Sequence, residues 1–199
     1  MTESDPSSLG LLLVEDSAVD AELVCDALHQ AGYRIDCRRV EDEDAFRAAL
    51  GDYLPDAILS DWTLPRFSGR TALVISRERC PEVPFLFVTG TMDESCAIEA
   101  LRQGASDYVY KHKLALLGPA LARALAGASE RRQHLRAEAE RYRLSEALRQ
   151  TSQPVILADI EGRITYVNPA LRRRPKITAP YFGLWEGSHS STLDGIHRA

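Results

Sequence analysis

The fold of this chain is decided by LLLVED, residues 11–16. Its four apolar residues have the length and composition of a strand that is buried on both faces, and Glu15 and Asp16 follow directly. The next segment, residues 17–31, is amphipathic and stops before Gly32. Its apolar residues at helical spacing are Val19, Leu23, Val24, Ala27 and Leu28. A buried strand followed at once by such a helix predicts a βα unit.

The same alternation repeats four more times along the chain. Further strands are expected at 33–40, 57–59, 85–88 and 108–110, with helices near 42–50, 70–79 and 93–103. Short apolar strands alternating with helices predict a doubly wound α/β fold, in which a parallel five-stranded sheet is covered by helices on both faces. In such folds ligands bind outside the carboxyl ends of the strands, where the chain order reverses.

Polar residues stand at these strand ends. Glu15 and Asp16 end the first strand, Asp61 the third and Thr89 the fourth, and Lys111 follows the fifth. Three carboxylates converging on one crevice repel each other unless a cation compensates them. Hard oxygen ligands with open positions suit a magnesium ion, so we expect Mg²⁺ to be bound here.

Beside such an ion, Asp61 can act as a nucleophile toward a phosphoryl group and form an aspartyl phosphate. The metal and Lys111 would neutralise charge on the transferring oxygens, and the Thr89 hydroxyl would donate a hydrogen bond to one of them. Each residue alone is a weak signal, because a carboxylate at a strand end is commonly a helix cap. Their joint occurrence at four strand ends predicts the chemistry.

Four stretches resemble the receiver domains of two-component response regulators in order and spacing, over roughly residues 9–126. They are LLLVEDS, ILSDWTLPRFSG, FLFVTGT and GASDYVYKHK. The resemblance implies a flavodoxin-like sheet of order 2-1-3-4-5, phosphotransfer from a histidine kinase or a phosphotransfer protein, and slow self-dephosphorylation. It also implies a phosphoprotein.

By position, Asp61 resembles the phosphoacceptor, Glu15 and Asp16 the acidic metal pair, and Lys111 the lysine of this family. Thr89 and Tyr108 resemble its hydroxyl–aromatic switch, although Tyr108 also suits a strand aromatic that only packs on the sheet edge. The positions that tune dephosphorylation would be Thr63 and Thr91.

Two residues depart from the family pattern. His112 stands where proline is common, and a cis bond before a non-proline residue costs about 3–4 kcal/mol, so we expect a trans peptide and a solvent-facing loop residue. Trp62 stands where a smaller apolar side chain is usual, and we expect it to shield the mouth of the site. In the loop after Asp61, Pro65 and Gly69 should shape the turn, with Gly69 supplying a turn conformation.

Downstream, residues 120–150 are strongly helical, and four residues recur every seven: Leu121, Ala128, Leu135 and Tyr142. Arg131 and Glu138 interrupt the companion apolar position. The helix is therefore either a signalling helix that pairs two chains, giving a homodimer, or a long last helix with a solvated face.

The stretch QPVILADIEGRITYVNPAL (153–171) predicts a hairpin with a turn at Glu161-Gly162, and it resembles the opening of a PAS sensory domain. We expect this partial segment to bind no cofactor. The predicted organisation is a receiver domain at 9–126, a helical connector at 127–152, a PAS-like segment at 153–171 and a disordered tail at 172–199.

Composition argues against several other classes of protein, namely nucleic-acid binders, membrane proteins and proteins with cysteine metal sites. The chain has 199 residues, 45% of them apolar, and a net charge of −5, so it has enough apolar residues for a core and no broad basic footprint for nucleic acid. No apolar run approaches a membrane span, and the start lacks a signal-peptide pattern, so we expect a soluble, cytoplasmic protein with no membrane partner. The four cysteines show no metal-ligand spacing and suit reduced thiols.

The leading hypothesis is a phosphorylation switch that is not an enzyme beyond its own phosphorylation and dephosphorylation. The alternative is a phosphorylation-silent interaction protein that dimerises through residues 120–150. A phosphatase with Asp61 as nucleophile is weaker, because Thr63 stands where such haloacid-dehalogenase-like enzymes have a second acid.

Overall fold

The computed structural model describes residues 8–90 and 93–172. The strands of its main sheet are β1 (Leu9–Val14), β2 (Ile35–Val40), β3 (Ala57–Ser60), β4 (Phe85–Thr89) and β5 (Asp107–Tyr110). The helices are α1 (Ala18–Gln30), α2 (Glu43–Asp52), α3 (Gly69–Arg79) and α4 (Glu94–Arg102), followed by the 3₁₀ helix η1 (Lys111–Leu116) and by α5 (Leu117–Gln150). All strand pairs are parallel, in the order β2-β1-β3-β4-β5. The predicted doubly wound α/β fold is confirmed.

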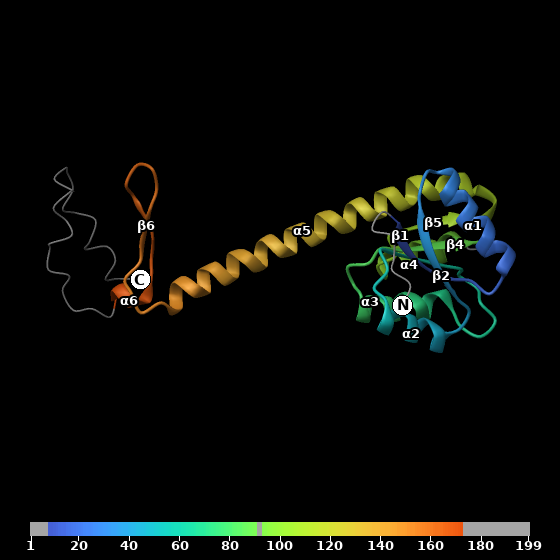
Figure 1. Ribbon diagram of the computed structural model, residues 1–199, viewed down its shortest axis with the longest axis horizontal. Helices are drawn as coiled ribbons and strands as arrows, with labels where there is room; N and C mark the ends of the chain where they lie inside the picture. The colour runs from blue at the N-terminus through green and yellow to red at the C-terminus, as the bar shows by residue number, and fades with distance from the viewer. Residues whose placement is uncertain (1–7, 91–92, 173–199) are drawn as a thin grey trace. The chain divides into compact units, whose positions relative to one another are not determined.

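The sheet has a hydrophobic cluster on each face, and β1 contributes to both. Leu11 and Leu13 point into the cluster under α1 and the start of α5, whereas Leu12 and Val14 point into the cluster under α2, α3 and α4. Figure 1 shows α1 and α5 on one side of the sheet and α2 and α3 on the other. Side chains alternate between the two faces of a strand, so a strand covered on both faces must be apolar at every position.

The buried face of α1 differs from the expected one. Val19 and Leu23 are 66% and 50% exposed, and Ala21, Val24 and Leu28 are the residues that pack on the sheet. The buried residues are spaced by three and four, as one face of a helix requires. Val19 and Leu23 lie on a neighbouring stripe of the helix with the same spacing. The periodicity of the sequence therefore predicted a buried face that is wider than the one observed.

Only the first part of α5 is buried. Leu121 and Ala128 are fully buried, whereas Leu135 and Tyr142, at the same seven-residue spacing, are 49% and 72% exposed. The chain divides into two compact units, Met1–Ala137 and Glu138–Ala199, and the boundary falls inside this helix. Among the described residues, no helix combines the length and apolar character needed to cross a membrane.

The second unit contains the expected hairpin. Strands β6 (Ile156–Ala158) and β7 (Ile164–Val167) pair antiparallel, and the short helix α6 (Pro169–Arg172) follows. Gly162 takes the turn with a φ of 82°, a value that glycine adopts without steric cost. Of the predicted tail, 172–199, all but Arg172 lies outside the described residues.

Asn168 joins this hairpin to the end of α5. Its side chain is buried, and its Oδ1 accepts a hydrogen bond of 2.8 Å from the Val155 amide. Its Nδ2 donates to the carbonyl oxygens of Leu148, Thr151 and Gln153. The last carbonyls of a helix have no partner within the helix, so this one amide stabilises both the helix end and the first strand of the hairpin.

Candidate phosphoryl-acceptor site

The adjacent ends of β1 and β3 bring three carboxylates together. Val14 pairs with Ser60 in the sheet, and the Asp61 amide donates to the Val14 carbonyl at 2.9 Å, so Glu15 and Asp61 leave the sheet side by side. Ligand oxygens of Glu15, Asp16 and Asp61 all lie within 4.8 Å of one another. These are the three residues that the sequence predicts as metal ligands.

Lys111 provides the positive charge at this site. Its Nζ lies 2.7 Å from Glu15 Oε2, 2.7 Å from Asp61 Oδ2 and 2.6 Å from Asp20 Oδ2. An ammonium group has three donors, and three different carboxylates accept from it here. Burial alone would lower the pKa of Lys111, but its hydrogen bonds to Asp20, Asp61 and Glu15 raise that pKa above its ordinary value. The lysine is therefore charged throughout the neutral range.

Glu15 is the deepest of the acids, with 1% of its surface exposed. Burial raises the pKa of Glu15, opposed by hydrogen bonds from Lys111 and from the Ser17 amide, while the charge of nearby Asp61 raises it further. A carboxylate in this position is stabilised by any additional cation. The electrostatics of the site therefore favour a bound metal ion.

The Asp61 side chain is largely buried but keeps one edge accessible. It is 8% exposed, its Oδ2 accepts from Lys111, and its Oδ1 accepts from the Thr63 amide at 3.3 Å. The two oxygens accept from separate segments, Thr63 just after β3 and Lys111 at the start of η1, so the orientation of the carboxylate is fixed.

Gly69 packs against the backbone of this loop. A Cβ at this position would lie 2.2 Å from the Asp61 carbonyl oxygen and 2.8 Å from the Phe87 ring, and the Gly69 amide donates to the Trp62 carbonyl at 3.1 Å. Its φ is not positive. The expectation that Gly69 supplies a special turn conformation is wrong, because what the position requires is space.

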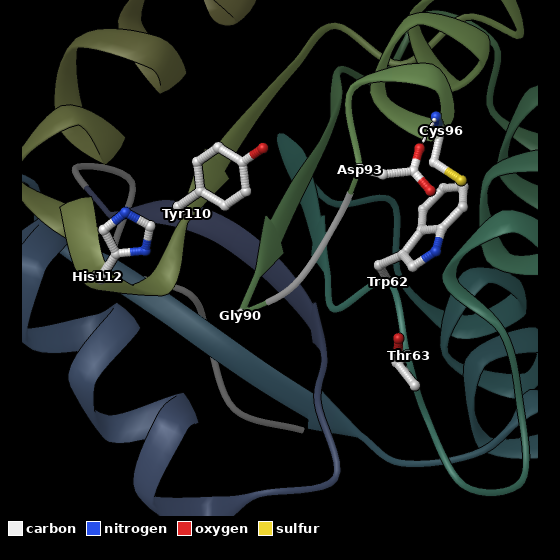
Figure 2. Close-up of a pocket in the computed structure, with 7 residues that line it drawn as sticks. All are labelled: Trp62, Thr63, Gly90, Asp93, Cys96, Tyr110 and His112. Carbon is white, nitrogen blue, oxygen red and sulfur yellow. Dashed lines mark hydrogen bonds between the residues drawn. The ribbon is translucent and has the colours of Figure 1, made fainter.

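A hollow of about 530 Å³ opens beside the segment that follows Asp61, and it is lined by Trp62, Thr63, Gly90, Asp93, Cys96, Tyr110 and His112. Figure 2 shows Trp62 on one side of it and Tyr110 on the other. The Trp62 ring meets the Phe87 ring edge-on, with 5.1 Å between the ring centroids. The exposed His112 stacks on Tyr110, with 5.3 Å between the ring centroids. The peptide bond before His112 is trans, as expected.

Comparison with known proteins identifies the family. The sequence model described as response regulator receiver domain matches residues 11–117, just over half of the 199 residues. This chain belongs to the response regulator receiver family. The expected receiver is thereby confirmed for that segment.

Curated relatives match part of this chain. The phosphate regulon transcriptional regulatory protein PhoB of Pseudomonas aeruginosa is 35% identical over 103 residues, which are 51% of this chain and 44% of PhoB. The DNA-binding transcriptional regulator NtrC of Proteus hauseri is 36% identical over 75 residues, 38% of this chain and 16% of NtrC. The chain thus spans less than half the length of these relatives.

Solved structures show the same fold. A putative response regulator from Chloroflexus aurantiacus superposes with a TM-score of 0.54 at 30% identity, covering 60% of this chain and 98% of that one. NtrX from Brucella abortus superposes with a TM-score of 0.58 at 27% identity, covering 65% of this chain and 29% of NtrX.

Two further residues of the receiver site carry predicted roles. Thr89 is the buried last residue of β4, and Tyr108 is half-buried on β5 with its ring edge-on to Tyr110 at 5.7 Å. Both lie on strands that end at the site, and their switching role stays a prediction. Thr91 lies outside the described residues.

Sequence reasoning missed two residues of the site. Asp20 binds Lys111 from the first turn of α1, and Arg39 Nη1 on β2 donates to the carbonyl oxygens of Glu15 and Asp16 at 3.2 and 3.1 Å. A sequence signal existed for Asp20, since the first turn of α1 begins just after the acidic pair. No signal existed for Arg39, because its contact depends on how β2 lies beside β1.

Proposed function

We propose that this receiver accepts a phosphoryl group on Asp61 in a Mg²⁺-dependent reaction, and that phosphorylation changes its contacts with partner proteins or with a second copy. The observation that carries the proposal is the Asp61 carboxylate, which contacts Lys111 at 2.7 Å and has its ligand oxygen within 4.8 Å of those of Glu15 and Asp16. Beyond its own phosphorylation and dephosphorylation, we infer no enzyme activity for the chain.

The residues fit a magnesium ion. Glu15, Asp16 and Asp61 offer hard carboxylate oxygens close together. Glu15 and Asp61 are buried and Asp16 is exposed, which leaves room for water ligands on the open side. When bound, the ion would supply positive charge to the oxygens of the transferring phosphoryl group.

The transfer itself relies on residues of the chain. An Asp61 oxygen attacks phosphorus, the bond from phosphorus to the donor's nitrogen breaks, and the donor nitrogen keeps the electron pair. Lys111 then donates to an oxygen of the new acyl phosphate in place of Asp61 Oδ2. We infer that the Thr89 hydroxyl is a second donor to the phosphoryl oxygens, and that the Tyr108 ring turns inward behind it.

A phosphorylated histidine, in a histidine kinase or a phosphotransfer protein, is the donor that we propose. PhoB and NtrC are named as transcriptional regulators, but the segment that they share with this chain is less than half of either protein. DNA binding is therefore not carried over to this chain.

A second candidate function rests on α5. Leu135 and Tyr142 expose apolar surface at seven-residue spacing, as a helix that pairs with a copy of itself would. The alternative is a phosphorylation-silent protein that dimerises through this helix. The hairpin is proposed as a partial PAS-like segment attached to the helix end.

The deciding experiment incubates the full chain with Mg²⁺ and acetyl phosphate and measures intact mass. We expect one phosphoryl adduct on the native protein and none on Asp61→Ala or in the presence of a metal chelator. Absence of an adduct on a folded native sample would contradict the proposal and favour the silent interaction protein. Steady turnover of a generic phosphatase substrate would instead favour hydrolase chemistry at Asp61.

A further inference from the structure

Asp20 contacts the functional lysine without belonging to the metal cluster. Its Oδ2 lies 2.6 Å from Lys111 Nζ, across a separation of 91 residues in sequence. The Asp20 side chain is 34% exposed and that of Lys111 is 19% exposed, so solvent only partly screens the pair. The three carboxylates that lie close enough to share a metal ion are Glu15, Asp16 and Asp61, and Asp20 is not among them.

The three carboxylates that accept from Lys111 differ in whether they can keep that contact during phosphorylation. Glu15 and Asp61 also belong to the metal set, so a bound cation competes with Lys111 for their oxygens. Asp61 additionally loses a carboxylate oxygen to the bond with phosphorus. Asp20 alone can keep its contact with Lys111 from the free site to the phosphorylated one.

We propose that Asp20 is a positioning residue, which holds the Lys111 ammonium in place while its other donors pass from Glu15 and Asp61 to the phosphoryl oxygens. This inference rests on the proposed function, because it assigns a role in that same reaction. A long lysine side chain loses substantial rotamer freedom when it is fixed. Because Asp20 would hold the lysine before the reaction, this side chain would already be ordered when negative charge develops on the phosphoryl oxygens.

The simpler reading is a structural one. An acid in the first turn of a helix interacts favourably with the helix dipole, and the Asp20 amide already donates to the Ser17 hydroxyl at 3.2 Å. That capping bond uses the Asp20 backbone and is independent of its side chain. Asp44 offers a matched control, since it is an acid in the first turn of α2.

The experiment compares Asp20→Ala, Asp20→Asn and the control Asp44→Asn in the full chain. The first readout is the rate of adduct formation from acetyl phosphate at saturating Mg²⁺. Loss of a whole oxyanion donor costs roughly 10²–10³ in rate, and for a lysine that is present but poorly held we expect a loss of about ten-fold in Asp20→Ala. Asp20→Asn keeps an oxygen acceptor and should recover part of that rate, while Asp44→Asn should match the native protein.

The second readout does not depend on phosphorylation. The ¹⁵N-detected ammonium signal of Lys111, assigned with Lys111→Ala, should be sharp in the native protein and in Asp44→Asn, and should broaden in Asp20→Ala as the group exchanges with water. Circular dichroism checks that each variant is folded.

The outcomes separate the two proposals. A native rate and an unchanged Lys111 signal in Asp20→Ala would overturn the positioning role, as would equal losses in Asp20→Ala and Asp44→Asn. Absence of any adduct on the native chain would instead defeat the proposed function. The Lys111 signal would still decide whether Asp20 holds the lysine, because a signal lost only in Asp20→Ala supports it and an unchanged signal overturns it.

Discussion

At the residue scale, the site combines a buried acid with a lysine that has several carboxylate partners. Burial raises the pKa of Glu15, and the hydrogen bonds from Lys111 and the Ser17 amide offset part of that effect by stabilising its charged form. A cation at the cluster would add to this stabilisation. Binding of metal and protonation of Glu15 are therefore competing events.

This competition predicts a pH dependence of Mg²⁺ binding. Because burial raises the pKa of Glu15 above its ordinary value, protons displace the metal at a higher pH than they would at an exposed glutamate. Calorimetric titration should show Mg²⁺ affinity falling as the pH is lowered from neutral toward the pKa of Glu15. Glu15→Gln should bind more weakly at neutral pH and lose most of this dependence; an unchanged dependence in that variant would contradict the assignment.

Gly69 leads to a prediction about stability. Gly69→Ala places a methyl group against the Asp61 carbonyl and the Phe87 ring, and overpacking of this kind costs about 1–3 kcal/mol. Urea unfolding should show this loss, and phosphorylation should slow because the loop after Asp61 must shift.

The matched control is Gly51→Ala in α2, where no atom lies within 4 Å of the added Cβ. Alanine is the better helix former there, by roughly 0.5–1 kcal/mol, so this variant should gain stability. The same substitution is thus expected to have opposite signs at the two glycines. Equal effects would show that backbone freedom and not space governs Gly69.

At the element scale, each of the helices α1 to α4 starts with a side-chain cap from Ser or Asp. Ser17, Asp42, Ser68 and Asp93 accept from amides in the first turns of α1, α2, α3 and α4. The C-terminal end of α5 is different, because the carbonyl of Leu148 in its last turn accepts from Asn168, a residue of a later segment.

Asn168→Ala should therefore detach the hairpin from the helix end. It removes the acceptor for the Val155 amide and the donor to three carbonyls, and an unsatisfied buried group costs about 1–3 kcal/mol. Hydrogen exchange should accelerate at Val155 and in β6 and β7, with no change in β1 to β5. Thr165→Ala, which removes one exposed hydrogen bond to Leu157, is the control and should leave Val155 protected.

At the scale of the whole molecule, the second part of α5 carries exposed apolar residues. Leu121 packs in the cluster on one face of the sheet and Ala128 is fully buried, and beyond them the seven-residue pattern continues on a solvent-exposed stretch. An apolar stripe of this kind is stabilised by a second helix, and a second copy of the chain offers the same stripe.

We expect the full chain to self-associate through α5. Sedimentation should show a concentration-dependent dimer that is weakened in the double variant Leu135→Ser, Tyr142→Ser, because each substitution removes exposed apolar surface. Exposed Leu116, which precedes α5, provides a control as Leu116→Ser and should leave the dimer unchanged. A monomer at all concentrations would support the other reading of this helix, a long last helix with a solvated face.

The sequence by itself determined the order of strands and helices, the parallel sheet and four of the strand ends that meet at the site. Those features depend on local periodicity and on the general geometry of βα units, which operate over short stretches of chain. The tertiary structure decided which stripe of α1 is buried, why position 69 needs glycine, and that Asp20 and Arg39 join the site. Each of these depends on contacts between segments far apart in sequence, whose distances no local pattern specifies.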